Sequence, residues 1–282
     1  RNFEGLSSRK KGPIKVLVGP WLHGHFTVER TFAGDIEFGE ESALESFRDV
    51  HKRWFDAALM GADTGIEDEA PVEIFVMGGG SGRRTAEGKL DHGGCWRQEQ
   101  EWPLARTKWT KLYLHRWQRL TFEPEEVPGK PDAFVQQPPD ETDDISSVQY
   151  VSERLEEDTE VTGPVACTLY AAIDQVDTNW FLSIRDVFPT GKEVELTKGF
   201  LKASHRALDE IRSTPFEPYH PHTDPVPVVP GEVTEYAIAL SPMSNVFKAG
   251  HRIKLVISSM DPVSYTHLRA HETRHALVCR LL

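Results

Sequence analysis

The stretch "HETRH", residues 271–275, has the residue types and the spacing of a zinc site. Two histidines four positions apart, with a glutamate after the first, would place two imidazole ligands and a general base on one helix face. A zinc protease also needs a third protein ligand, and no His, Asp or Glu follows His275. The pattern is therefore incomplete, and we expect neither a metal nor an organic cofactor.

A second pair of histidines, in "VGPWLHGHF" (18–26), is better placed for catalysis. His23 follows the apolar stretch "IKVLVG" (14–19), which predicts a short strand buried in a parallel sheet. Open α/β sheets carry catalytic side chains just beyond the carboxyl ends of their strands, so His23 is a candidate general base. Taken alone, it is more simply explained as a hydrogen-bonded loop histidine. His25 would add an H-x-H metal pair, but no third ligand follows at short spacing.

The residues after His25 predict a helix and a second buried strand. Ser42 and Glu45 have the spacing of a capping box, and Gly61 is a stop signal. Between them, side chains suited to a buried stripe recur at intervals of three and four, at Leu44, Phe47, His51, Trp54 and Ala58. The apolar run "VEIFVMG" (72–78) follows. Strand, helix and strand in this order predict an α/β arrangement, in which Trp54 serves packing rather than a site.

After about residue 108 the pattern changes to short alternating strands, which predicts an all-β part. The stretches are "TKLYLH", "VQYVS", "ACTLYAAI", "WFLSIRDVF", "TEYAIAL" and "HRIKLVIS". We expect residues 123–147, rich in proline and acids, to be a long surface connection. Trp180 and Phe181 should point to opposite faces of one strand. The loop histidines His220 and His222 are expected to be solvated, and Trp96 and Trp102 to pack where the two parts meet.

Composition narrows the function classes. The formal net charge of −12 over 282 residues argues against nucleic acid and anionic membranes as partners, because phosphate binding needs a basic patch. The sequence contains no apolar run of about 18 residues and no visible signal peptide, so localisation stays undetermined. Cys95, Cys167 and Cys279 form no C-x-x-C pair. A small-molecule or short peptide substrate is the expected partner, and a homo-oligomer is left open.

Motifs along residues 1–262 resemble, in order, the Xaa-Pro dipeptidyl-peptidase and cocaine-esterase (CocE/NonD) family of serine hydrolases. In the α/β part they are "GPWLHGH", "FG" (38–39), "RWFDAALMG", "VEIFVMGG" and "CWRQEQEWPL". In the all-β part they are "YVSERLEEDTEVTGPV", "DTNWFLSIRDVFPTG", "GFLKASHRALD" and "FKAGHRIKLVISS". The resemblance implies the C-terminal end of an α/β-hydrolase domain at 1–107, followed at 108–262 by a truncated, galactose-binding-like jelly-roll β-sandwich.

The resemblance also implies a Ser-His-Asp triad in which His23, in the matching "GPWxH", is the general base. Such enzymes hydrolyse peptide, ester or amide acyl bonds, as dipeptidyl-peptidases (serine proteases) or esterases. The family's substrates range over Xaa-Pro peptides, aromatic esters, α-amino acid esters and acylated β-lactam nuclei. In this fold the serine and the acid precede the histidine, but the residues before His23 contain no G-x-S-x-G, only Ser7 and Ser8, and a single acid, Glu4. We therefore expect a fragment that is inactive by itself.

From Val263 onward the family resemblance stops. "VSYTHLRAHET" resembles the conceptual translation of a transposon-type sequencing adaptor, and "LVCRLL" resembles the primer sequence that normally follows it. We interpret residues 263–282, and "HETRH" with them, as adaptor-derived. A competing hypothesis treats the all-β part as a carbohydrate- or protein-binding module without catalysis, because jelly rolls also host lectin-type functions.

Overall fold

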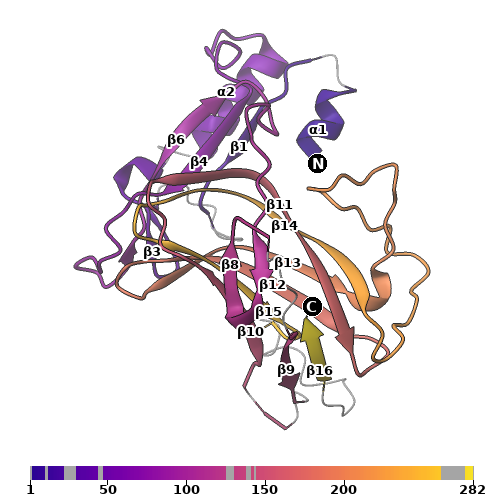
Figure 1. Ribbon diagram of the computed structural model, residues 1–282. Helices are drawn as coiled ribbons and strands as arrows, with labels where there is room; N and C mark the ends of the chain where they lie inside the picture. The colour runs from indigo at the N-terminus through magenta and orange to yellow at the C-terminus, as the bar shows by residue number, and fades with distance from the viewer. Residues whose placement is uncertain are drawn as a thin grey trace. The chain divides into compact units, whose positions relative to one another are not determined.

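The computed structural model divides the chain into two compact units (Figure 1). Unit 1 comprises Arg1–Lys108, Glu157–Gly163 and Ser244–Ala249, and unit 2 comprises Trp109–Glu156, Pro164–Met243 and Gly250–Leu282. The structure describes residues 2–9, 12–21, 30–43, 47–124, 130–137, 141–142, 144–261 and 277–281. The predicted assignment of 1–107, 108–262 and 263–282 to separate domains stays a prediction.

Unit 1 contains the predicted strand, helix and strand. Strand β1 (Val16–Val18) pairs in parallel with β4 (Val72–Gly78), and helix α2 (Phe47–Met60) lies between them in the chain. Strand β6 (Gly94–Glu99) then pairs antiparallel with β4 on its other edge. The inward side chains of β4 are almost fully buried, and the partly buried hydrophobic residues Phe3, Val16, Trp102 and Val246 pack against them. This part therefore follows the α/β pattern.

Helix α2 begins later than the capping box predicts. Ser42 lies in the short 3-10 helix η1 (Glu40–Ser42), where its Oγ donates to the carbonyl of Gly39 at 2.7 Å. Glu45 lies outside the described residues. The hydroxyl of Ser42 is therefore used by its own turn, the next residue Ala43 is extended, and the described part of α2 begins at Phe47.

The predicted buried stripe of α2 is wrong by one position. His51 and Ala58 are exposed, whereas Val50, Trp54 and Ala57 are partly buried. Both sets repeat at intervals of three and four and share Trp54, so the spacing alone does not distinguish them. Trp54 therefore serves packing, as expected, but on a face that includes Val50 and Ala57 in place of His51 and Ala58.

Among the described residues of unit 2, the regular secondary structure consists of strands, most of them paired antiparallel, and of two short 3-10 helices. The remaining strands of the chain are β2 (Phe32–Ala33), β3 (Ile36–Glu37), β5 (Leu90–Asp91), β7 (Tyr113–His115), β8 (Arg119–Thr121), β9 (Asp132–Gln136), β10 (Ser147–Ser152), β11 (Thr159–Ile173), β12 (Asn179–Val187), β13 (Glu193–Lys202), β14 (Thr234–Phe247), β15 (Arg252–Ser258) and β16 (Leu277–Leu281). The further helices are α1 (Asn2–Ser7), η2 (Arg116–Gln118) and η3 (Ala203–His205). Within the described residues, no helix is long and apolar enough to cross a membrane.

The central strands of the large sheet carry the core of unit 2. The strand order is β7-β8-β10-β15-β12-β13-β14-β11-β16-β9, and β12 pairs antiparallel with both β13 and β15. Trp180 is completely buried with its ring centroid 5.3 Å from that of Tyr236, whereas its neighbour Phe181 is only partly buried. The prediction that these two side chains lie on opposite faces of one strand is confirmed.

Two segments predicted as surface connections are more ordered than expected. Residues 132–136 form β9, where Phe134 and Gln136 are buried on alternate positions. The prolines that suggested a loop flank this strand rather than interrupt it. His220 is also not solvated, because its Nδ1 lies 3.1 Å from the carbonyl oxygen of Ala207 and its Nε2 lies 2.8 Å from that of Ala237.

Candidate active site at the carboxyl end of strand β1

The predicted general base His23, the neighbouring His25 and the "HETRH" stretch all lie outside the described residues. The structure does describe the approach to His23. Strand β1 ends at Val18, and Gly19, Pro20 and Trp21 lead from its carboxyl end. The site is therefore described from the residues that hold this lead segment.

Trp21 is the last described residue before His23, and it begins a row of packed rings. Its ring centroid lies 5.6 Å from that of Trp96, and the ring of Trp96 meets the edge of Phe75 at 5.3 Å. Phe75 then contacts Phe38 at 5.7 Å, and Phe38 contacts the buried His92 at 6.2 Å. Each aromatic pair contributes about 0.5–1.5 kcal/mol beyond the area it buries. The lead segment is thus anchored to the interior of unit 1.

Gly19 allows this anchoring. A Cβ atom at Gly19 would lie 2.6 Å from the indole of Trp21, so the ring folds back over backbone that carries no side chain. The Nε1 atoms of Trp21 and Trp96 are buried, and neither has a hydrogen-bond partner among the described residues. Packing, rather than hydrogen bonding, therefore fixes the direction in which the chain leaves β1.

The inner end of the aromatic row is tied to strand β14. His92 and Asn245 are fully buried, and the Nε2 of His92 lies 2.9 Å from the Oδ1 of Asn245. Because an amide oxygen only accepts, Nε2 carries the hydrogen in this arrangement. Asn245 is opposite Met77 in the parallel pairing of β14 with β4. The polar pair therefore connects the rings to β14, which pairs with β4, the parallel neighbour of β1.

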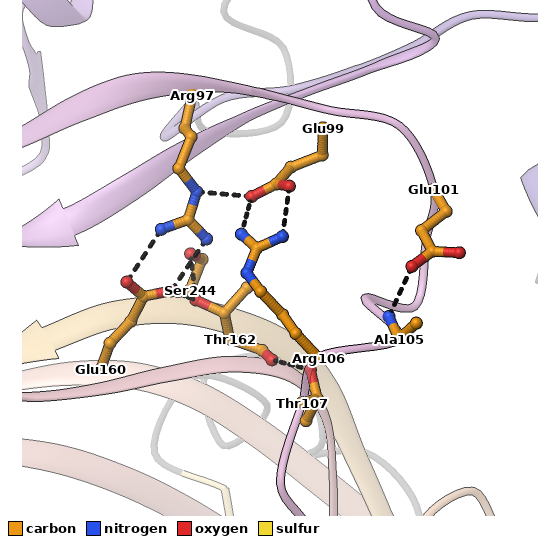
Figure 2. Close-up of polar contacts among 9 residues, drawn as sticks. All are labelled: Arg97, Glu99, Glu101, Ala105, Arg106, Thr107, Glu160, Thr162 and Ser244. Atoms are coloured by element: carbon orange, nitrogen blue, oxygen red, sulfur yellow. Dashed lines mark hydrogen bonds and ion pairs between the residues drawn. The ribbon is translucent and has the colours of Figure 1, made fainter.

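A group of four charged side chains lies at the end of β6 (Figure 2). The Nη1 and Nη2 of Arg97 each donate at 2.8 Å to the carboxylate of Glu160 on β11. Its Nε lies 2.6 Å from Glu99, which also accepts from both terminal nitrogens of Arg106. Thr162 donates to Glu160 at 2.6 Å. Glu99 therefore lies between two guanidinium groups, and Glu160 is paired with one.

These contacts decide the protonation of the two acids. The hydrogen bond from Arg106 lowers the pKa of Glu99, and the hydrogen bond from Arg97 lowers the pKa of Glu160, in both cases against the opposing effect of burial. A carboxylate held ionised by guanidinium groups is a poor proton donor, and its oxygens are already occupied. The network therefore joins β6 to β11 and does not supply acid–base chemistry.

The two serines before His23 have structural roles. Ser7 is the last residue of α1, and its Oγ donates to the carbonyl of Phe3 at 2.7 Å. Ser8 donates to the carbonyl of Gly5 at 3.3 Å. Both hydroxyls are thus engaged with backbone carbonyls of helix α1, and neither lies on the strained strand-to-helix turn of a hydrolase nucleophile. Within the described part of the chain, no group of three or more His, Cys, Asp or Glu side chains is arranged to hold a metal.

Sequence reasoning proposed His23, whose role stays a prediction, but missed the residues that hold its approach. Trp96 and Trp102 were expected where the two parts meet; their described contacts are inside unit 1, with Trp21 and Phe75 for Trp96 and with the β4 core for Trp102. The pair Arg97 and Glu99 was recognisable, because residues two apart on a strand share a face. Their partner Glu160 lies 63 positions away from Arg97 and was not recognisable.

A family model and a sequence relative place this chain among proteins of the same kind. A family model described as the X-Pro dipeptidyl-peptidase C-terminal non-catalytic domain matches residues 64–275. The cocaine esterase of Rhodococcus sp. (strain MB1 Bresler) is 26% identical over 295 residues, which cover 92% of this chain and 46% of that protein. The family match extends beyond Val263, and the interpretation of 263–282 as adaptor-derived stays a prediction.

Solved structures show the same fold. An aminopeptidase from a marine sediment archaeon, Thaumarchaeota archaeon, superposes with a TM-score of 0.74 at 19% identity and covers 99% of this chain and 49% of that one. A CocE/NonD family hydrolase from Staphylococcus aureus gives a TM-score of 0.63 at 20% identity, covering 85% of this chain and 44% of that one. The chain thus spans about half the length of the proteins it matches.

Proposed function

Because the chain belongs to the Xaa-Pro dipeptidyl-peptidase and CocE hydrolase family, we propose that it is the C-terminal part of a serine hydrolase with His23 as general base. In the whole protein, a serine and an acid outside these 282 residues complete a Ser-His-Asp triad. The all-β part is the proposed jelly-roll β-sandwich of galactose-binding type. It supplies no residue to the triad.

One observation carries the proposal of His23. The segment Gly19–Trp21 leaves the carboxyl end of β1, which pairs in parallel with β4. In open α/β sheets this edge is where catalytic side chains and ligands are found. His23 follows Trp21 by two positions, and Trp21 is held by Trp96. A histidine attached to a firmly packed strand end suits a base that must meet a serine in a fixed orientation.

The proposed reaction is acyl transfer to water. His23 accepts the serine proton as the serine oxygen attacks the carbonyl. It then donates that proton to the leaving group, which departs, and the acyl-enzyme remains. In the second half, His23 accepts a proton from water as the water oxygen attacks the acyl-enzyme. The protonated imidazole finally restores the serine hydroxyl. The triad acid holds the ring in one tautomer.

The substrate class follows from the relatives and not from the described residues. One relative is named a cocaine esterase, and a structural neighbour is named an aminopeptidase. We propose a small acyl ester, amide or short peptide as the substrate, with Xaa-Pro dipeptidyl-peptidase activity as one member of that class. No metal or organic cofactor takes part in the proposed steps.

Hydrolysis of p-nitrophenyl acetate tests the proposal. We expect no turnover by the 282-residue chain and fluorophosphonate-sensitive turnover by the protein encoded when the source reading frame is extended upstream. In the longer protein, His23→Ala should lower kcat by about 10⁴-fold or more. His25→Ala is the matched control and should retain most of the activity. Fluorophosphonate-sensitive turnover by the 282-residue chain, or full activity of His23→Ala, would overturn the proposal.

A further inference from the structure

The rings of three histidines lie near one another in unit 2. His205 ends the short helix η3, which follows β13, whereas His220 and His222 lie in the proline-flanked stretch "YHPHTDP". The ring centroid of His222 lies 5.7 Å from that of His205 and 5.8 Å from that of His220. No role for this cluster follows from the proposed hydrolase.

The separation of His205 and His222 is close to that of two rings sharing one metal ion. Metal–nitrogen distances to imidazole are about 2.0–2.1 Å, and adding roughly 1.2 Å to the ring centre gives centroids about 5.3 Å apart at a tetrahedral angle. The observed 5.7 Å between the two centroids needs only a small adjustment or a wider angle. The Nδ1 of His205 is buried and has no hydrogen-bond partner among the described residues. A buried ring nitrogen of this kind is unusual, because such atoms normally find a partner.

The segment that carries His222 is held in place. Both ring nitrogens of His220 lie within hydrogen-bond distance of backbone carbonyls, those of Ala207 and Ala237. His222 and Asp224 adopt left-handed backbone conformations with φ of 55° and 50°. Such conformations are uncommon for residues other than glycine and persist where the surroundings determine them. The backbone beside His205 is therefore organised before any ligand arrives.

The residue that follows His205 in the chain is a cation, Arg206. The nearby cation Arg206 is turned toward backbone, because its Nη1 donates to the carbonyls of Ala203 at 3.1 Å and Val226 at 2.6 Å.

We propose that His205 and His222 bind a divalent transition-metal ion, with water in the remaining coordination positions. Imidazole ligands suit Cu²⁺, Ni²⁺ and Zn²⁺, and Cu²⁺ binds such sites most tightly. His220 is not a further ligand, because both of its ring nitrogens lie within hydrogen-bond distance of backbone carbonyls, so the proposed ion has two protein ligands. The site is independent of the hydrolase proposal.

Copper titration of the untagged 282-residue chain tests the site. The background protein carries His23→Gln, His25→Gln, His271→Gln and His275→Gln, which removes the H-x-H pair and the H-E-x-x-H pair of histidines with metal-ligand spacing. At substoichiometric Cu²⁺ we expect electron paramagnetic resonance with hyperfine coupling to two imidazole nitrogens. Competition with a chromogenic chelator gives the Kd, and excess Zn²⁺ should displace the copper.

Single substitutions identify the ligands. His222→Gln, on an exposed loop position, and His205→Gln should each weaken Cu²⁺ binding about tenfold or more and leave one coupled nitrogen. His51→Gln, at an exposed position of α2, is the matched control and should change neither quantity. Circular dichroism confirms folding, and His222→Gln decides the outcome if His205→Gln unfolds. An unchanged Kd and two coupled nitrogens in His222→Gln would overturn the proposal.

Discussion

At the scale of single residues, the approach to His23 depends on one glycine and two tryptophans. The indole of Trp21 occupies the space that a Gly19 side chain would fill, and it packs on Trp96. Interiors are packed to crystal-like density, so a methyl group inserted here must displace the ring. The two tryptophans therefore report directly on how the lead segment is held.

We predict that Gly19→Ala detaches Trp21 from Trp96. The added Cβ would lie 2.6 Å from the indole, so the ring must move, at a cost of about 1–3 kcal/mol in the free energy of unfolding. The near-ultraviolet circular dichroism spectrum should lose the contribution of the Trp21–Trp96 pair. Urea denaturation measures the free energy of unfolding. Gly12→Ala is the control, because nothing lies within 4 Å of its added Cβ. Unchanged spectra in Gly19→Ala would contradict the packing described for Trp21.

Residue types and spacing indicated the candidate base but not its supports. His23 was recognisable because a buried strand followed by "GPWLH" places it by local sequence alone. The aromatic row joins Trp21, Phe38, Phe75 and Trp96, which lie far apart in the chain and meet only after the strands pair. Local patterns carry no information about such meetings, and this is why the sequence provided a candidate base, which stays a prediction, without the residues that pack around its approach.

At the scale of elements, strand β14 comes close to the end of β4. Val246 is opposite Gly78 in their parallel pairing, and a Cβ at Gly78 would lie 2.2 Å from the Val246 carbonyl oxygen. Gly78 also has a φ of 99°, in the region that favours glycine. The next residue, Gly79, has a φ of 89° but open space around it. Comparing substitutions at Gly78 and Gly79 therefore separates the cost of a left-handed backbone from the cost of the close approach to Val246.

We predict that Gly78→Ala destabilises unit 1 more than Gly79→Ala. Both substitutions force a left-handed alanine, at about 1–2 kcal/mol. Gly78→Ala adds the clash with Val246, so its total loss should be larger by about 1–3 kcal/mol. Urea denaturation of the two variants measures the difference. Equal losses would mean that β14 does not approach β4 as closely as described.

Elements with a strong local sequence pattern were predicted well. Elements that form by pairing with a strand far away in the chain were not. The run "VEIFVMG" matches β4 residue for residue, because a continuous apolar stretch ending in glycine has few alternatives. β9 was missed because it is short and flanked by proline-rich sequence, and its pairing with β16 is not visible locally. The stripe of α2 was misplaced because Trp54 fits two spacings.

At the scale of the whole molecule, acidic residues outnumber basic residues. The chain has 44 acidic and 32 basic residues, so its net charge is −12 at pH 7. Two of these acids, Glu99 and Glu160, have lowered pKa values because guanidinium groups donate to them. A carboxyl group with a lowered pKa in the folded state stabilises the protein above its unfolded pKa, and this contribution is lost as pH falls through the folded pKa. The relevant window lies below about pH 4.5.

We predict that Glu99→Gln destabilises the protein at pH 7 and reduces its loss of stability in acid. Removing the carboxylate leaves Arg97 and Arg106 without a shared partner, at a cost of about 1–3 kcal/mol at a nearly buried position. Below about pH 4 the gap to the unsubstituted protein should narrow, because Glu99 is then protonating as well. Urea denaturation between pH 7 and pH 3 measures both effects. Glu101→Gln is the matched control, since Glu101 is exposed and its carboxylate accepts from the backbone N–H of Ala105. A gap that stayed constant with pH would show that packing, and not the ionised network drawn in Figure 2, accounts for the contribution of Glu99.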